Sequence, residues 1–221
     1  MLTIALETSH RAASVAILFN AELTEFQLDP LRAHASDCLA WISDWFAEQG
    51  LAPQSIDHVI VGSGPGSYTG LRIGIATAIG LARGATAQAF AVPSGEALCW
   101  RELEEGQEAI YLLDARQDEL YFAHYARNAL DVEVHREACV LRTAELAGAL
   151  PKGLTIFGDR KALELGGMGP ETLALHRDVP PPNAGAVLRL GLQRLEQDGP
   201  HALQDIEPLY LRPFAAKVRR R

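Results

Sequence analysis

Short apolar runs separated by polar turns open the chain, and a helical period follows them. The runs predict strands over 3–6, 14–19 and 22–28, which tight turns would join into an antiparallel meander. From 33 to 49 the apolar positions recur with the period of a helix, and Gly50 stands where a C′ glycine would end it.

The next part of the chain returns to strands and crossover helices. The continuous apolar run 57–61 predicts a strand that is buried on both faces. A glycine-rich segment over 62–70 follows this strand. Beyond it we expect a helix over 71–83, a strand over 87–92 and a helix that Ser94 caps.

A charged stretch over 101–108 marks a boundary, after which the pattern of strands and helices begins again. Asn183 is expected to cap a long helix, and 166–182, rich in Gly and Pro, to be irregular. The remaining expected elements are strands at 109–113, 119–125, 132–141 and 155–157, a short helix from Thr143, and the long helix at 184–197.

The order of these elements indicates the fold class. A meander followed by crossover helices is not the order of a doubly wound sheet, and it matches the half-motif of actin-like ATPases. We therefore predict a mixed α/β fold of this actin-like type, and the fold alone does not define a function.

Composition narrows the class of protein further. With 48% hydrophobic and 22% charged residues, the sequence is typical of a globular protein. It has no apolar run of membrane-spanning length, and its apolar start stops at Glu7 without a signal-peptide pattern. Three cysteines, far apart, argue against a disulfide framework, so we expect a cytoplasmic protein with no membrane partner.

The net charge of −8 bears on nucleic-acid binding. A protein that grips nucleic acid by itself usually presents a basic surface, because neutralised phosphates supply much of the affinity. The basic cluster here is the tail, from Arg212 to Arg221. It is either a solvated end or a secondary contact to a nucleic acid that another protein holds.

The glycine-rich segment has the sequence Gly-Ser-Gly-Pro-Gly-Ser-Tyr-Thr-Gly and is not a Walker loop, because no Gly-Lys-Ser/Thr follows. It is a tight structural turn, a phosphate contact or a partner-docking loop. In an actin-like fold, the turn after the first strand is a phosphate loop. Glu7 and two hydroxyl residues would crowd a phosphate there, which makes hydrolysis doubtful. The candidate nucleotide-binding residues are Thr8, Ser9, Gly64, Gly66 and Ser67.

The seven histidines are never three or four residues apart, the spacing with which a helix directs two imidazoles at one metal ion. We therefore predict no metal site, although a site assembled from distant histidines stays open. Nothing resembles the Gly-x-Ser-x-Gly nucleophile motif of a hydrolase either.

The helix over 33–49 carries more apolar residues than one packed face requires. It is either buried within the chain or a protein–protein surface, since aromatic anchors gather at interface centres. The following helix is rich in small residues, which allow a second helix to approach closely. The candidate partner-binding residues on these helices are Leu39, Trp41, Ile42, Trp45, Arg72, Gly74 and Thr77.

Five segments in order resemble the TsaB (YeaZ) family. Residues 64–74 resemble its GPGSFTGLRIG signature with Tyr68 in the Phe place, and 4–9 resemble its IDTS opening with Glu7 replacing Asp. His34 stands where the family has a histidine before its first long helix. Asp114-Ala115-Arg116 with Glu119-Leu120-Tyr121 resembles its DAR…E-V-Y segment, and 208–212 resembles its PxYLR ending.

This resemblance implies an actin-like (ASKHA, ribonuclease H-like) fold with two subdomains, here 1–105 and 106–221. It implies a non-catalytic partner of TsaD in threonylcarbamoyladenosine modification of tRNA, with TsaD binding the metal and TsaE joining as an ATPase. His34 and Tyr68 would join the partner-binding set. The resemblance implies no required cofactor, and it leaves weak binding of ATP or ADP as an alternative. It also leaves open a homodimer when the chain is alone. Contact with tRNA would occur only through the complex. The alternatives are a metallopeptidase, after the family's glycoprotease (M22) label, and an ATP-hydrolysing enzyme.

Overall fold

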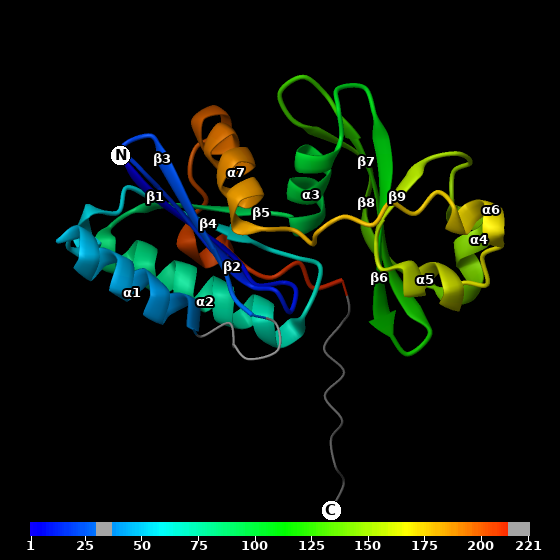
Figure 1. The fold of residues 1–221 in the computed structure, drawn as a ribbon, viewed down its shortest axis with the longest axis horizontal. Helices are drawn as coiled ribbons and strands as arrows, with labels where there is room; N and C mark the ends of the chain where they lie inside the picture. Colours follow the sequence, from blue (N-terminus) through cyan, green and yellow to red (C-terminus); the bar gives the residue numbers. More distant parts are fainter. Residues whose placement is uncertain (30–36, 212–221) are drawn as a thin grey trace, which may run out of the picture.

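Two β-sheets, each begun by an antiparallel meander, form the two lobes of the molecule (Figure 1). The computed structural model describes residues 1–29 and 37–211. The first sheet has the order β3-β2-β1-β4-β5 and the second the order β8-β7-β6-β9. In each sheet the strand order begins with two antiparallel pairs and continues with a parallel pair, β1 with β4 in the first sheet and β6 with β9 in the second. The second sheet therefore repeats the first four strands in the order of the first sheet.

The first sheet is antiparallel through the meander and parallel from β1 through β4 to β5. Every residue of β1 is buried, as a continuous apolar run predicts for a strand covered on both faces. Its strands are β1 (Leu2–Glu7), β2 (Ser14–Phe19), β3 (Glu22–Gln27), β4 (His58–Gly62) and β5 (Gln88–Val92).

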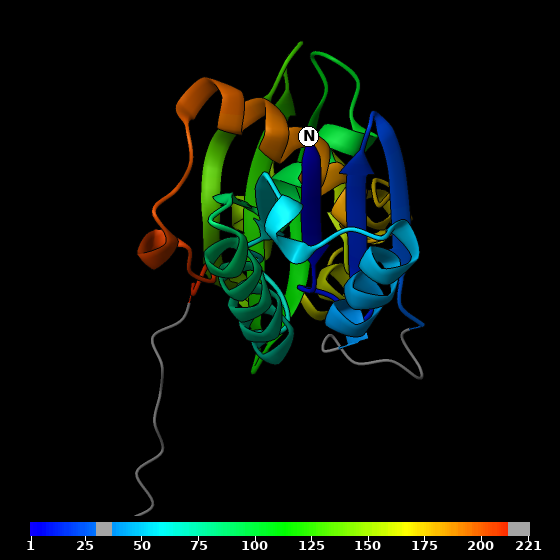
Figure 2. The ribbon, with the colours of Figure 1, turned by 90° about the vertical axis from the view of Figure 1, so that its left-hand side faces the viewer.

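Helices cover both faces of this sheet. On one face lie α1 (Asp37–Gln49) and α2 (Tyr68–Ala85), seen next to each other in Figure 2, with residues of both in one core. On the other face α7 (Ala184–Asp198) packs, with α3 (Ser94–Glu102) beside it. The three-residue 3-10 helices are Pro53–Ser55, Thr143–Glu145 and Leu203–Asp205.

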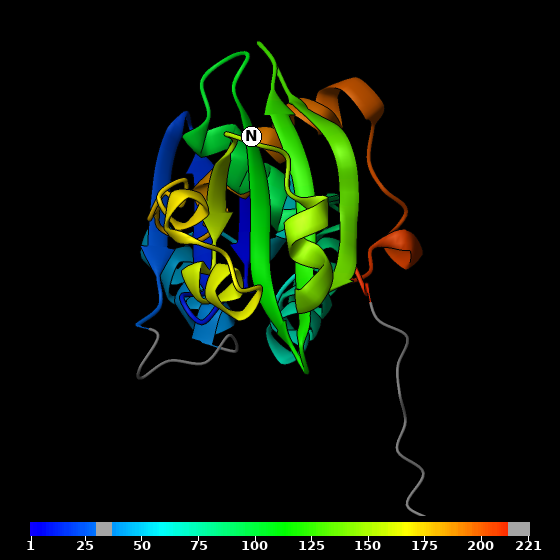
Figure 3. The ribbon, with the colours of Figure 1, turned by 90° about the vertical axis from the view of Figure 1, so that its right-hand side faces the viewer.

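The second sheet consists of β6 (Glu108–Arg116), β7 (Glu119–Arg127), β8 (Val132–Arg142) and β9 (Thr155–Gly158). Its inner face packs on Leu98, Cys99 and Leu103 at α3, so α3 lies between the lobes. Its outer face carries α4 (Leu146–Ala149), α5 (Arg160–Leu165) and α6 (Pro170–Leu173), as Figure 3 shows. Among the described residues, no helix is long and apolar enough to cross a bilayer.

The predicted α/β fold of actin-like type is confirmed, and Asn183 caps α7 by accepting a hydrogen bond from the Ala186 amide. Three local expectations need correction. Ser94 does not cap α3; its Oγ accepts instead from the Gly64 amide at 3.1 Å. The helix expected from residue 71 begins at Tyr68, because Ser67 caps it. The region expected to be irregular contains α6. Residues 33–36 of the predicted first helix lie outside the described residues, as does the basic tail.

The predicted division at residues 105 and 106 falls in the connection between α3 and β6. One element of the later part nevertheless belongs spatially to the first sheet. Helix α7 packs its apolar face on β1, β2, β4 and β5, and the Ser14 hydroxyl accepts a hydrogen bond from its first amide, that of Ala184, at 2.8 Å. The second lobe is therefore an insertion between α3 and α7.

Candidate functional site

A cleft of about 1360 Å³ lies between the lobes. The first lobe supplies the turn after β1 and the start of α2, and the second lobe supplies the ends of β6 and β9. The segment 209–211 closes one side, held by a hydrogen bond from the Leu209 amide to the Ser63 carbonyl at 2.8 Å. In an actin-like protein a nucleotide would lie between two such walls.

On the first wall, the turn after β1 and the glycine segment touch each other directly. The Ser67 amide donates to the Ser9 carbonyl at 2.6 Å, and Ser67 Oγ accepts from the Gly70 amide at 3.2 Å. A Cβ on Gly66 would collide with the Ser9 backbone, and one on Gly74 with the Thr8 side chain. These glycines therefore allow two segments of the chain to approach each other closely.

Of the three hydroxyl residues proposed for nucleotide binding, Ser67 is exposed at the cleft, whereas the two in the turn after β1 are buried. Thr8 and Ser9 are both buried, and the Thr8 hydroxyl has no hydrogen-bond partner among the described residues. Glu7 is buried as well, and one of its oxygens accepts from the Ser9 amide at 2.6 Å. The structure thus gathers Thr8, Ser9, Gly66 and Ser67 at one point, while Gly64 is held by Ser94 on the far side of the segment.

His10 links the two walls. Its Nδ1 lies 2.7 Å from Ser9 Oγ, and its Nε2 lies 3.3 Å from the Tyr111 hydroxyl on β6. Burial lowers the pKa of His10 from 6.5, against the opposing influence of the Glu7 and Asp159 carboxylates. Burial also raises the pKa of Tyr111 well above 10. Both side chains are therefore neutral bridging groups near pH 7.

On the second wall, carboxylates stand at the ends of the parallel pair β6 and β9. Asp159 accepts from the Asp114 amide at 2.9 Å, and Asp114 accepts from the Arg116 amide at 2.8 Å. The side chains of Arg116 and Lys161 lie 3.4 and 3.7 Å from the Asp114 carboxylate. These acids are thus engaged in shaping the turn and in ion pairs.

A cation–aromatic group stands at the mouth of the cleft. The Arg72 guanidinium lies 4.8 Å from the centre of the Tyr68 ring, and this ring lies 5.7 Å from that of Tyr210. Tyr68 and Tyr210 are both exposed. Sequence reasoning selected Tyr68 and Arg72 but missed Tyr210, whose place beside them depends on the path of the segment after α7.

The predicted partner-binding residues of α1 fall partly in the core and partly on the surface. Ile42 and Trp45 are only 2% and 9% exposed, and Trp45 packs edge-to-face on Phe19 at 6.0 Å. These two residues belong to the core of the first lobe, because the helix has the sheet beneath it, and the structure does not support their place in a partner surface. Trp41 is half-buried and stacks on Phe26, and Leu39 is 48% exposed.

The small-residue helix α2 is also two-sided. Gly74 is buried against Thr8, so it serves packing inside the chain, and Thr77 is half-buried. On the outward side, Ala76, Gly80 and Gly84 recur every four residues and are exposed. No atom lies within 4 Å of a Cβ built on Gly80 or Gly84. His34, the remaining predicted contact, lies outside the described residues.

Two lobes of actin-like topology, with a cleft between them and the glycine segment packed on the turn after β1, define a class: an α/β protein of the actin-like fold. Residues 30–169 match the sequence profile of TsaD, tRNA N6-adenosine threonylcarbamoyltransferase. The chain belongs to the family that this profile describes, and the resemblance to the TsaB (YeaZ) family predicted from the sequence is confirmed by the relatives that follow.

Individual relatives agree with this assignment. The Escherichia coli tRNA threonylcarbamoyladenosine biosynthesis protein TsaB is 29% identical over 96% of this chain and 95% of its own. The Haemophilus influenzae protein of the same name is 35% identical, over 56% of this chain and about half, 53%, of its own. A Pseudomonas aeruginosa structure with similarity to peptidase YEAZ superposes with a TM-score of 0.80 at 26% identity, covering 96% and 99% of the two chains.

Proposed function

We propose that this chain is a non-catalytic subunit of tRNA threonylcarbamoyladenosine synthesis that docks on a TsaD-type transferase through the outward faces of α1 and α2. The TsaB name of its relatives supports the pathway. The proposal extends to a TsaE-type ATPase as a third component, to a homodimer when the transferase is absent, and to contact with tRNA only through the complex, in the cytoplasm.

The main support for the docking role is the small-residue stripe of α2, which consists of the exposed residues Ala76, Gly80 and Gly84. A glycine inside a helix costs about 1 kcal/mol relative to alanine. The glycine at position 74 is explained by packing inside the chain, because a larger residue there would collide with Thr8. Gly80 and Gly84 have no such neighbour and face open space. Their use is explained if a helix of another protein lies against α2, because small residues let two helix backbones approach closely. Leu39, exposed on α1, adds an apolar contact on the same face of the sheet.

The first wall of the cleft supports the non-catalytic part of the proposal. An actin-like ATPase needs space for phosphate oxygens and a magnesium ion beside the turn after β1. Here Gly66 and Gly70 press against the Ser9 and Thr8 backbones in that place. The Glu7 side chain is turned into the protein beside Gly62. Weak binding of ATP or ADP in the outer part of the cleft stays a prediction.

A bulky residue on the stripe tests the docking surface. Gly80→Gln fits the free chain, so the melting temperature should stay the same or rise, while binding to the TsaD-type protein of the same organism should be lost. Gly148→Gln is the matched control, because Gly148 is an exposed helical glycine of α4 with equally open surroundings. Calorimetric titration measures binding, and a transfer assay shows whether the transferase needs this chain.

Equal binding by Gly80→Gln and Gly148→Gln would show that the partner uses another surface. Hydrolysis of ATP or peptide by the purified chain alone would contradict the non-catalytic role.

A further inference from the structure

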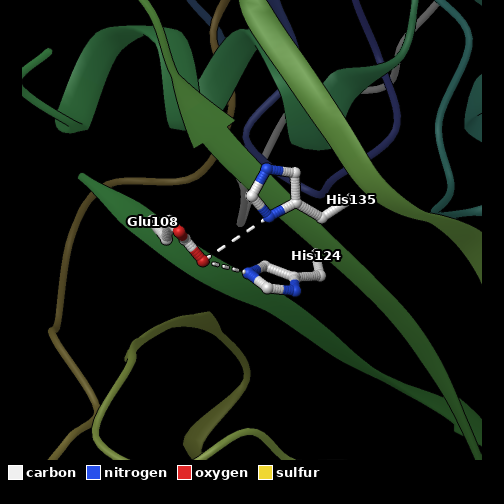
Figure 4. A group of neighbouring side chains, drawn as sticks. All are labelled: Glu108, His124 and His135. Atoms are coloured by element: carbon white, nitrogen blue, oxygen red, sulfur yellow. Dashed lines mark hydrogen bonds and ion pairs between the residues drawn. The ribbon is translucent and has the colours of Figure 1, made fainter. Parts of the chain in front are cut away.

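Three strands of the second sheet bring a carboxylate and two imidazoles together, as Figure 4 shows. Glu108 begins β6, His124 lies on β7 and His135 lies on β8. Irregularities in the β7–β8 register on both sides of His124 adjust the two strands here. The group is at the end of β6 opposite Asp114, so it is separate from the cleft.

The distances within the group suit a small metal ion. Glu108 Oε2 lies 2.8 Å from His124 Nε2 and 3.5 Å from His135 Nδ1, and one ligand atom from each residue falls within 4.8 Å of the others. In a tetrahedral zinc site with bonds of about 2.0–2.1 Å, neighbouring ligand atoms are about 3.3 Å apart. Small rotations of the side chains would therefore bring all three atoms into one coordination sphere.

The hydrogen bond between His124 and Glu108 does not by itself explain why a second imidazole points at the same carboxylate. A hydrogen bond between His124 and Glu108 accounts for the shorter distance, but His135 is directed at the same oxygen atom. The two rings meet edge to face with their centres 4.8 Å apart. Two imidazoles and a carboxylate are the ligand types that zinc and similar divalent ions prefer.

We propose that Glu108, His124 and His135 bind one divalent transition-metal ion, zinc in the first instance, with the fourth position open. The side chains of His124, His135 and Glu108 are 15%, 32% and 37% exposed, so an ion can reach them from solvent. The ion joins three adjacent strands and leaves its open position for water or a donor atom of another molecule. This site is independent of the docking role proposed above.

Glu133 strengthens the case, because it lies on the other side of the His135 ring. Its carboxylate is 3.5 Å from His135 Nε2, the nitrogen that does not face Glu108. A carboxylate on the second ring nitrogen fixes the orientation of a ligating histidine and raises its basicity, and loss of such a partner typically weakens metal binding by about 10–100-fold. Glu133 is thus a positioning residue for the proposed site.

The test uses the full chain without a histidine tag, freed of metal by a chelator. Zn²⁺ titrated calorimetrically should bind with one ion per chain, and Co²⁺ should give the visible absorption of a tetrahedral site that Zn²⁺ then removes. His124→Gln with His135→Gln should abolish both signals, and Glu108→Gln should weaken them. Glu133→Gln should lower the zinc affinity by about 10–100-fold while the stoichiometry stays at one.

His58→Gln is the matched control, because His58 is a half-buried strand histidine on β4 in the other lobe, and it should bind zinc as the unaltered chain does. Melting curves in chelator show that each variant is folded. The conservative Glu108→Gln, with almost unchanged shape, keeps the test valid if the double variant is unstable. Failure of the unaltered chain to bind zinc with one ion per chain, or equal binding by the double variant, would overturn the proposal.

Discussion

Arg194 of α7 donates from Nη2 to Asp131 Oδ1 at 2.7 Å, and this contact joins the first lobe to the turn between β7 and β8. The same nitrogen lies 2.7 Å from Glu96 Oε2 on α3. Burial raises the pKa of Glu96, while the Arg194 guanidinium opposes that rise. One cation therefore neutralises two acids where α3, α7 and the second lobe meet.

Removing this cation should loosen the junction of the lobes. We expect Arg194→Met to lower the free energy of unfolding by about 3 kcal/mol, because it leaves a buried and a half-buried carboxylate without their partner. Arg189→Met, at an exposed position of the same helix, should change it by less than about 0.5 kcal/mol. Urea unfolding of both variants measures this, and equal midpoints would show that the junction does not depend on Arg194.

Two glycines of α2 should respond oppositely to the same methyl group. Gly74→Ala should destabilise the chain by about 1–3 kcal/mol, because the new Cβ meets the Thr8 side chain. Gly84→Ala should stabilise it by about 0.5–1 kcal/mol, since its surroundings are open and a helical glycine is lost. Thermal unfolding compares them. If the clash is the cause, Gly74→Ala should cost much less in a Thr8→Ala background.

The residues of α1 should separate into core and surface by their stability effects. Trp45→Ala should lower the free energy of unfolding by about 3–5 kcal/mol, as truncation of a buried aromatic does. Leu39→Ala should leave it within about 0.5 kcal/mol and weaken binding to the transferase. Urea unfolding and calorimetric titration give the two quantities. A large stability loss from Leu39→Ala would place that side chain in the core and remove it from the docking surface.

His10 should make stability depend on pH. Its pKa is lowered in the folded protein, so the unfolded chain binds the proton more readily. The contribution is present above the unfolded value near 6.5 and is lost as the pH falls from there through the lowered folded value. Unfolding measured between about pH 7 and pH 5 should show a steeper loss for the unaltered chain than for His10→Gln. Parallel curves would show that His10 does not titrate in this range.

Local patterns in the sequence were sufficient for most strands and for the capped start of α7, because side-chain alternation and caps act over a few residues. They were not sufficient where distant segments compete for the same group. Ser94 could have capped α3, but the Gly64 amide takes its hydroxyl. The residues Glu108, His124 and His135 meet through strand register and its irregularities, and a search for helical histidine spacing does not detect such a group.

The insertion of the second lobe between α3 and α7 also determines the order in which the chain completes its folding during synthesis. When residue 105 leaves the ribosome, all five strands of the first sheet exist, but Ala5, Ile60 and Val92 lack the apolar residues of α7 that cover them. That face stays exposed to solvent until α7, which begins at Ala184 and ends at Asp198, has left the ribosome. A nascent chain stalled before residue 184 therefore lacks α7 and presents an apolar sheet surface that a chaperone can bind.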